Sequence, residues 1–182
     1  MYYMLQNYTM MNVAKVFFDY PTEEHYLKEI SRASKIAHTS VKNNLMDMKK
    51  EEIITEVIEK KGKRKFPIYK ANLENPSYRK LKKIHNLINL QDSGMIGFLK
   101  DKLMPRCIVL FGSYQRGEDI EESDIDIYIQ GSKEEINLDR FKKKLNRNIK
   151  LHFNENFDEY SKELKNNIIN GIVIYGYLEV FE

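Results

Sequence analysis

Apolar residues in the first half of the chain recur at helical spacing and then give way to two strand-like runs. Residues 9–19, 24–33 and 39–48 carry apolar side chains three and four positions apart, which predicts three successive helices. The runs 53–58 and 66–71 are rich in β-branched and aromatic residues and predict two paired strands. The expected order is therefore three helices followed by a hairpin.

The second half of the chain predicts a sheet covered by helices. Apolar stripes at helical spacing occupy residues 77–90 and 95–103. Beyond them we expect strands at 106–111, 124–129, 148–153 and 171–181, and helices at 133–146 and 155–167. Because these strands alternate with helices, this half is expected to form an α/β domain.

The charges divide unevenly between the two halves. Residues 1–90 hold 17 Lys and Arg against 10 Asp and Glu, a net charge of +7, whereas residues 91–182 hold 13 against 17, a net charge of −4. A basic first half favours an anionic partner. The lone cysteine, Cys107, permits no intramolecular disulfide, and no segment approaches 18 apolar residues. These features predict a cytoplasmic protein with no membrane span.

Candidate chemistry gathers around two neighbouring strands. Gly112 and Ser113 close the strand 106–111 in a tight turn, where the backbone can approach a triphosphate and Ser113 can donate hydrogen bonds to phosphate oxygens. After ten intervening residues, Asp124 and Asp126 share one face of the next strand, because side chains alternate along a strand. Two carboxylates so placed suit Mg²⁺ or Mn²⁺, which bridges nucleotide phosphates.

The pattern Gly-Ser, ten residues, Asp-x-Asp resembles the signature of the nucleotidyltransferase superfamily that includes DNA polymerase beta, in particular its minimal branch. The resemblance implies a polymerase-beta-like α/β fold. It also implies transfer of a nucleoside monophosphate, expected to be AMP, from a nucleoside triphosphate to a hydroxyl acceptor. By this resemblance, Gly112 and Ser113 hold phosphates and Arg116 neutralises their charge, while Asp124 and Asp126 are the catalytic metal ligands. Many minimal-branch members are antitoxins that nucleotidylate a partner toxin, so a protein acceptor is one expectation, and antibiotics and nucleic-acid ends are others.

One residue departs from this signature. Members of the superfamily usually carry a third carboxylate on the next strand, and the corresponding segment, 148–153, has Lys150 at that position. A lysine offsets part of the charge of Asp124 and Asp126 and competes with a second cation. Three interpretations stay open: the site works with one metal, another group helps, or catalysis is lost. His152 shares the face of Lys150 and is a candidate base, although a surface or hydrogen-bonded histidine is the commoner role.

The first half resembles the winged helix-turn-helix domain that archaeal-type proteins fuse to a nucleotidyltransferase domain. This resemblance implies two domains, at residues 1–74 and 105–182, joined by a helical linker at 75–104. The third helix, capped by Thr39 or Ser40, would enter a DNA major groove, and the hairpin tip would follow the adjacent backbone. The residues expected to contact DNA are Arg32, Thr39, Ser40, Lys42, Asn43, Asn44, Lys61, Lys63, Arg64 and Lys65.

Other roles fit the same residues. A basic hairpin tip is usually a solvated surface, and winged helices also serve as protein-interaction modules. The Tyr, Leu and Ile stripe of residues 77–90 suits a core or a homodimer contact. Two further functions therefore stay open. The first is a DNA-binding regulator whose transferase domain binds nucleotide without turnover, and the second is an antitoxin or scaffold that works by binding its partner.

Overall fold

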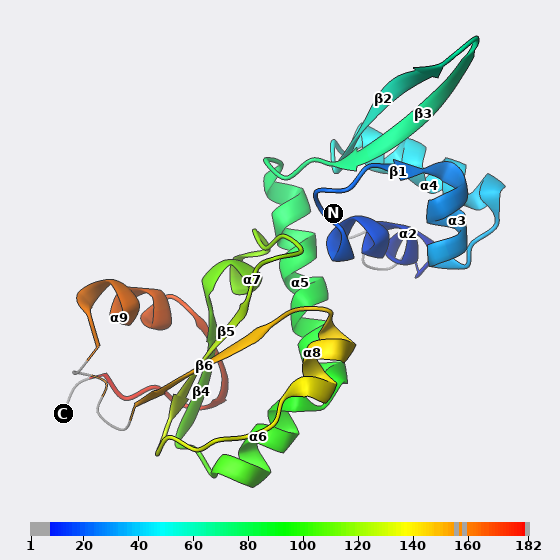
Figure 1. Cartoon of the computed structure of the whole chain (residues 1–182). Helices are drawn as coiled ribbons and strands as arrows, with labels where there is room; N and C mark the ends of the chain where they lie inside the picture. Colours follow the sequence, from blue (N-terminus) through cyan, green and yellow to red (C-terminus); the bar gives the residue numbers. More distant parts are fainter. Residues whose placement is uncertain (1–7, 155–156, 158–159, 181–182) are drawn as a thin grey trace. The chain divides into compact units, whose positions relative to one another are not determined.

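The computed structural model describes residues 8–154, 157 and 160–180, and the chain divides into two compact units, Met1–Lys82 and Lys83–Glu182 (Figure 1). Helix α5, Pro76–Ser93, crosses this division. Within the segment predicted as a linker, 75–104, Tyr78 packs in the core of the first unit and Met95 in a core of the second. Among the described residues no helix, α5 included, is long and apolar enough to cross a membrane.

The first unit contains the predicted order of three helices and a hairpin, with one short strand added. Its elements are α2 (Tyr8–Asp19), β1 (His25–Tyr26), α3 (Leu27–Ser34), α4 (His38–Lys50), β2 (Ile54–Lys61) and β3 (Arg64–Ala71). Strand β3 lies between β1 and β2, and both pairings are antiparallel. The helix predicted from residue 24 begins later, because His25 and Tyr26 pair with β3.

The core of the first unit forms where the three helices meet the base of the hairpin. Phe17 of α2, Ile30 of α3 and Leu45 of α4 are buried there together with Tyr69 of β3. The hydroxyl of Tyr78 donates a hydrogen bond to the carbonyl of Phe17 over 2.7 Å, which satisfies a polar group inside the core. Apolar residues at helical spacing therefore supply the buried faces of α2, α3 and α4, with the buried Asn44 of α4 as the exception.

The second unit is a four-stranded sheet with helices on both faces. After α5 its elements are α6 (Met95–Leu103), β4 (Cys107–Phe111), α7 (Gly112–Arg116), β5 (Ile125–Gln130), α8 (Asp139–Leu145), β6 (Ile149–Asn154), α9 (Lys162–Ile169) and β7 (Ile172–Gly176). The strand order is β6-β5-β4-β7, in which only β5 and β6 run parallel. The prediction of an α/β arrangement in this half is confirmed.

Alternation along the strands gives this sheet two cores. Ile125, Ile127 and Ile129 of β5 lie in a cluster with residues of α6 and α8. Tyr128 points to the opposite face and packs with Ile168 of α9. Asp126, two positions before Tyr128, therefore belongs to the α9 face and lies at the start of its strand.

In the second unit, two predicted helices begin too early and one predicted strand is too long. Helix α8 begins at Asp139 rather than near residue 133, because the side chain of Asn137 accepts the Asp139 N–H over 2.8 Å and starts the helix there. Helix α9 begins at Lys162, where the Ser161 side chain caps the N–H of Leu164. Strand β7 covers only part of the predicted 171–181, and residues 155–156, 158–159 and 181–182 lie outside the described residues.

Candidate active site

The turn after β4 brings the backbone against a carboxylate. Strand β4 is buried along its whole length and is followed directly by Gly112, which has a φ of +80°. A Cβ atom added to Gly112 would stand 2.6 Å from Oδ2 of Asp126. Both the backbone conformation and the space require glycine. The structure thus brings the predicted turn and the predicted carboxylate pair together.

The two aspartates occupy the start of β5. Phe111, the last residue of β4, is the antiparallel partner of Asp126. Asp124 immediately precedes the strand, and the next residue, Ile125, donates its N–H to the carbonyl of Asn148 over 2.9 Å. Pairing with β6 therefore fixes the backbone between the two carboxylates. Both carboxylates are half-buried, as expected for groups that meet a ligand at the rim of a sheet.

Strand β6 presents a row of hydrogen-bond donors to the two aspartates. Asn148 donates through Nδ2 to Asp124 Oδ1 over 2.7 Å, and Lys150 Nζ lies 2.5 Å from Asp124 Oδ2. His152 Nε2 lies 3.1 Å from Asp126 Oδ1. These donors alternate along the chain, so they share one face of the strand. The predicted position of Lys150 beside the carboxylates is confirmed, because it is the parallel partner of Asp126.

The contact between Lys150 and Asp124 favours the charged form of both groups. The hydrogen bond from Lys150, followed by the one from Asn148, lowers the pKa of the Asp124 carboxyl below its usual value. The same bond to Asp124 raises the pKa of Lys150. The Lys150 side chain is 57% exposed and that of Asp124 is 23% exposed, so water screens the pair. Both groups are ionised at neutral pH.

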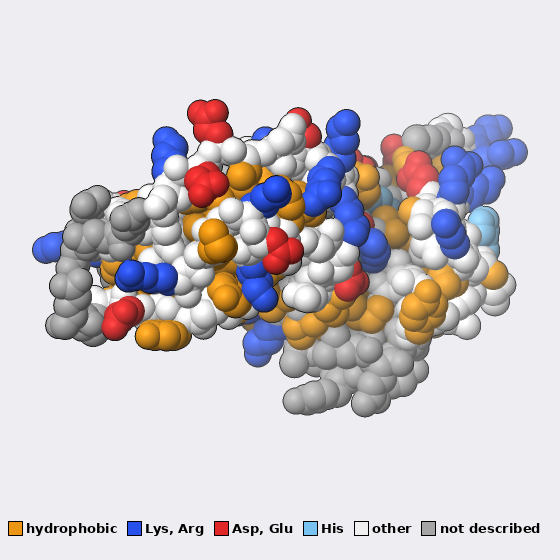
Figure 2. All heavy atoms as spheres, turned by 90° about the horizontal axis from the view of Figure 1, so that it is seen from below, with side chains coloured by type: hydrophobic (Ala, Val, Ile, Leu, Met, Phe, Trp, Pro, Cys, Tyr) orange, Lys and Arg blue, Asp and Glu red, His pale blue; other side chains and the backbone are white. Residues whose placement is uncertain are grey.

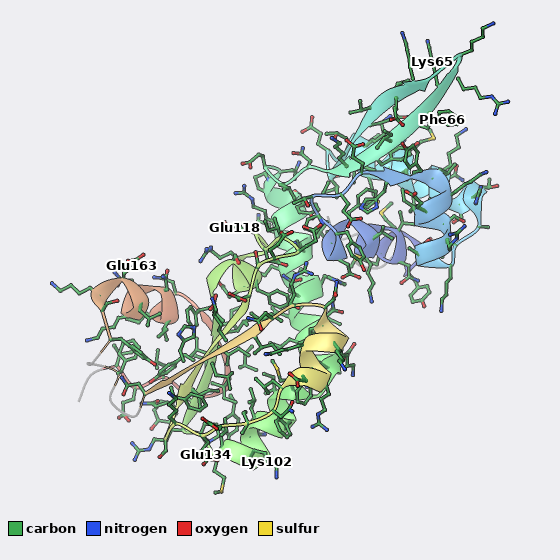
Figure 3. The ribbon with its side chains drawn as sticks, in the orientation of Figure 1. Lys65, Phe66, Lys102, Glu118, Glu134 and Glu163 are labelled. Atoms are coloured by element: carbon green, nitrogen blue, oxygen red, sulfur yellow. The ribbon has the colours of Figure 1, made fainter. Side chains whose placement is uncertain are left out.

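The remaining residues of the predicted phosphate site lie on the short helix α7. Ser113 is half-buried, and its carbonyl accepts the N–H of Glu118 over 3.0 Å. Arg116 is exposed and its Nε lies 2.7 Å from a carboxylate oxygen of Glu118, which Figure 3 labels near α7. The guanidinium expected to meet phosphate is thus paired with an acidic side chain that no sequence pattern singled out.

A buried polar network holds the loop between α7 and β5, and sequence reasoning missed it. Asp119 is 1% exposed and forms an ion pair with Arg147 over 3.4 Å. Asn86 of α5 donates to Asp119 Oδ1 over 2.7 Å and to the carbonyl of Tyr114 over 2.9 Å. Because these groups are far apart in the sequence, no local pattern marks them. The network fixes the loop that ends at Asp124.

The two aspartates suit one divalent cation that is also bound by a nucleotide. Within residues 8–154, 157 and 160–180, no three Asp, Glu, His or Cys side chains converge into a metal-binding group. Mg²⁺ is commonly held by one or two carboxylates and completed by substrate phosphates and water. Asp124 and Asp126 are such carboxylates, and Asp126 Oδ2, beside Gly112, accepts no hydrogen bond from the described residues. The pair therefore suits a cation that arrives with a triphosphate.

Known proteins share sequence features with this part of the chain. Residues 94–179 match the family described as "Polymerase beta, Nucleotidyltransferase". A stretch of 32 residues is 62% identical to "Putative protein adenylyltransferase MJ1379" of Methanocaldococcus jannaschii. These two matches support the nucleotidyltransferase superfamily. The aligned stretch covers 18% of this chain and only 32% of the relative, about a third of that protein's length.

One solved structure was also found to be similar. It is the "Possible transcriptional regulator from Methanosarcina mazei Go1", which has 20% sequence identity over 50% of this chain and 74% of its own. Its TM-score is 0.35, a level at which neither a shared fold nor a shared function follows. Support for the nucleotidyltransferase superfamily therefore comes from the family match and the Methanocaldococcus relative.

The residues predicted to meet DNA lie in the first unit, and one of them is placed differently from the prediction. Thr39, Lys42 and Asn43 are exposed on α4, Ser40 is half-buried, and Arg32 is exposed on α3. Asn44 was expected to face outward, and this is wrong. Its side chain is 5% exposed and donates to the carbonyl of Ser40 over 2.9 Å. The predicted cap is also wrong, because α4 begins one residue before Thr39 with Ala37 as its N-cap.

The basic hairpin tip extends away from the core of its unit. Lys63, Arg64 and Lys65 are exposed, and Figure 3 shows Lys65 and Phe66 at the outer end of the hairpin. The side chain of Lys61 lies outside the described set. Figure 2 shows Lys and Arg side chains on several parts of the face that it draws, and the exposed cations of the hairpin tip are Lys63, Arg64 and Lys65. An exposed group of cations is available there to an anionic partner.

Proposed function

We propose that this chain transfers a nucleoside monophosphate, AMP by preference, from a nucleoside triphosphate to a hydroxyl acceptor. The observation that carries the proposal is the contact between Gly112 and Asp126, which puts a close-approach turn beside a carboxylate pair in a segment that matches nucleotidyltransferases. The name of the Methanocaldococcus relative supports adenylyl transfer as the form of the reaction.

Each residue has a role in this proposal. Asp124 and Asp126 hold a Mg²⁺ or Mn²⁺ ion, which neutralises phosphate charge when bound. Gly112 and Ser113 receive the outer phosphates. Arg116 turns from Glu118 toward the triphosphate, an exchange of one exposed ion pair for another that costs little. Catalysis is then mainly positioning and electrostatics.

The proposed transfer is a substitution at the α-phosphorus of the triphosphate. The acceptor oxygen forms a bond to the α-phosphorus while the bond from that phosphorus to the bridging oxygen breaks, and pyrophosphate leaves. The hydroxyl proton needs an acceptor, and His152 is the candidate because it lies beside the carboxylate pair; with its Nε2 directed at Asp126 Oδ1 over 3.1 Å, its Nδ1 is the nitrogen that could accept the proton. The acceptor hydroxyl belongs to a protein, such as a partner toxin, with antibiotics and nucleic-acid ends as the other classes.

The first unit is proposed to act as a winged helix that binds DNA. The exposed face of α4 supplies Lys42 and Asn43 for a major groove, and the hairpin tip supplies cations for the flanking backbone. The net charge of +7 on residues 1–90 supports this assignment. DNA binding would let the same chain act as a regulator.

A second candidate function is a nucleotide-binding regulator or antitoxin with weak or no turnover. The ion pair between Lys150 and Asp124 favours it, since a lysine occupies one carboxylate of the pair. For this second candidate, the C-terminal unit senses nucleotide or binds a partner, and nucleotide transfer is weak or lost.

Labelling distinguishes the two candidates. The full chain is incubated with cell lysate, Mg²⁺ or Mn²⁺, and each nucleoside triphosphate labelled at the α-phosphate. The first proposal expects a labelled macromolecule with the wild type and with Asp101→Asn, an exposed control on α6, but not with Asp126→Asn. Nucleotide binding that needs Asp126 without any labelling would favour the second candidate, and the absence of both would overturn the site assignment.

A further inference from the structure

The three donors on β6 are not equivalent, because only Lys150 brings a permanent charge to the carboxylate pair. Asn148 is neutral, whereas the Lys150 side chain ends in an ammonium group. Lys150 Nζ lies 2.5 Å from Asp124 Oδ2, so an ammonium already holds the oxygen that faces β6. The site therefore contains a cation that belongs to the protein.

We propose that the Lys150 ammonium takes the position of a second divalent ion and limits the carboxylate pair to one bound divalent cation. The inference rests on the proposed function, because it assumes that the pair binds a metal with its nucleotide. It deepens that function by fixing how many ions the site accepts and which residue decides the number.

Formal charges support a single ion. Asp124, Asp126 and Lys150 together carry −1, so one divalent ion brings the site to +1 and a second would bring it to +3. With an aspartate at position 150, two ions would again leave +1. The lysine thus supplies part of the charge that a second ion would otherwise bring to the triphosphate.

The positions of Lys150 and of the open Asp126 oxygen also favour a single ion. Mg²⁺ binds oxygen at about 2.0–2.1 Å, and an ion on Asp124 Oδ2 would have to displace the ammonium or sit against it. The oxygen that the described residues leave open is Asp126 Oδ2, on the Gly112 side of the pair. One ion can bind on that side while Lys150 stays on the β6 side.

The sheet, rather than a chance side-chain rotamer, holds Lys150 near the pair. Lys150 is the parallel partner of Asp126, and the register continues to Tyr128 with His152 and beyond. The N–H of Ile125 donates to the carbonyl of Asn148 over 2.9 Å, which extends the pairing to the residue beside Asp124. The register therefore holds the Lys150 backbone next to the carboxylates.

Counting bound Mn²⁺ tests the inference without measuring turnover. The full chain is dialysed to equilibrium against Mn²⁺ and a non-hydrolysable ATP analogue, and bound metal is measured together with its electron paramagnetic resonance spectrum. We expect one ion per wild-type chain with an uncoupled spectrum. For Lys150→Asp we expect two ions with a spin-coupled spectrum, since paired ions in such sites lie about 3.5–4 Å apart. Lys143→Asp, an exposed change on α8, should keep one ion.

A second variant covers the case in which Lys150→Asp fails to fold. Lys150→Gln removes the charge without adding a ligand, and it should raise the affinity of the single site for Mn²⁺ by up to about fivefold, the upper range for a screened pair. Two ions in the wild type, a single ion in folded Lys150→Asp, or unchanged affinity in Lys150→Gln would each overturn the inference and leave the proposed function standing. A wild type that binds no ion dependent on Asp124 and Asp126 would overturn the proposed function itself.

Discussion

Gly112 and Asp126 lie so close together that a Cβ atom on Gly112 would stand 2.6 Å from the Oδ2 atom of Asp126. The glycine directly follows Phe111, the last residue of β4, and Phe111 is the antiparallel partner of Asp126 in β5, so the register of these strands creates the contact. The missing side chain leaves the one carboxylate oxygen of the pair that the described residues do not engage open to a ligand. This relationship is the structural basis of the proposed nucleotide site.

Replacing Gly112 by alanine should damage binding more than stability. The added Cβ would push the Asp126 carboxylate aside, and the φ of +80° adds about 1–2 kcal/mol of backbone strain. Gly94→Ala is the matched control, because Gly94 has a φ of +79° and nothing within 4 Å of an added Cβ. Thermal unfolding should show similar destabilisation in both variants, while calorimetry should show loss of Mg²⁺-dependent ATP binding only in Gly112→Ala. Equal ATP binding by the two variants would contradict a nucleotide site formed by Gly112 and Asp126.

Neutralising the carboxylate pair should remove the metal-dependent part of ATP binding. Triphosphate and two aspartates repel each other unless a cation lies between them, so wild-type binding should be weak without metal. Asp124→Asn combined with Asp126→Asn should weaken binding in Mg²⁺ by more than about tenfold, the equivalent of about 1.4 kcal/mol. Calorimetry with Asp101→Asn as the control checks this, and unchanged affinity in the double variant would refute the site.

Replacing Lys150 by aspartate should raise the rate of nucleotide transfer. The new carboxylate supplies a metal ligand and a candidate proton acceptor in the place of a side chain that pairs with Asp124. The measurement is the initial rate of labelling at saturating nucleotide, with Lys143→Asp as the control for the change in charge. A fast wild type that this substitution slows would show that the chemistry uses a different arrangement.

The full chain should bind duplex DNA with an affinity that falls steeply with salt. Changing Lys63, Arg64 and Lys65 to glutamine should weaken all sequences alike and reduce the salt slope by roughly 0.9 for each phosphate that the variant no longer neutralises. Lys80→Gln, on the exposed face of α5, is the control. Gel retardation across a salt series measures this effect, and binding unaffected by the triple change would assign the hairpin another role.

Asn43 and Asn44 should behave differently in the same assay. Asn43 is exposed, so Asn43→Ala should alter preference among sequences by about 1–3 kcal/mol if it contacts a base. Asn44 is buried against Ser40, so Asn44→Ala should lower stability without a specific change in sequence preference. Competition among duplexes and thermal unfolding separate the two effects. A change in preference caused by Asn44 alone would contradict the observed face of α4.

Cys107 should remain an unreactive thiol in the folded protein. Burial raises the pKa of Cys107 to about 11, whereas an unfolded cysteine ionises near about 8.5. Its contribution to stability is therefore complete below a pH of about 8.5 and is lost as pH rises toward 11, at up to about 1.4 kcal/mol per pH unit. Denaturant titrations from about pH 8 to about pH 10.5 should show a shallower loss in Cys107→Ala than in the wild type. An equal loss of stability with pH in the two proteins would contradict the buried neutral thiol. Rapid labelling of Cys107 in the folded protein by a thiol reagent at about pH 8 would also contradict it.

The sequence determined the elements that depend on local pattern. Alternation along β5 placed the two aspartates and Tyr128 on one face, because a strand directs successive side chains to opposite sides. Helical spacing located α2, α4 and α6 to within a residue or two, because each buries one apolar stripe. The Gly112 turn and its distance in sequence from Asp124 were equally local features.

Only the tertiary structure decided which distant groups meet. Asn44 lies inward because α4 packs its Ser40 side against α2, and no helical periodicity of apolar residues marks a buried asparagine. The pairing of Lys150 with Asp124 follows from the parallel register of β5 and β6, which joins residues far apart in the chain. The ion pair of Asp119 with Arg147 has the same origin. Periodicity fixes the face on which a side chain lies, whereas its partner depends on how strands and helices from separate parts of the chain pack together.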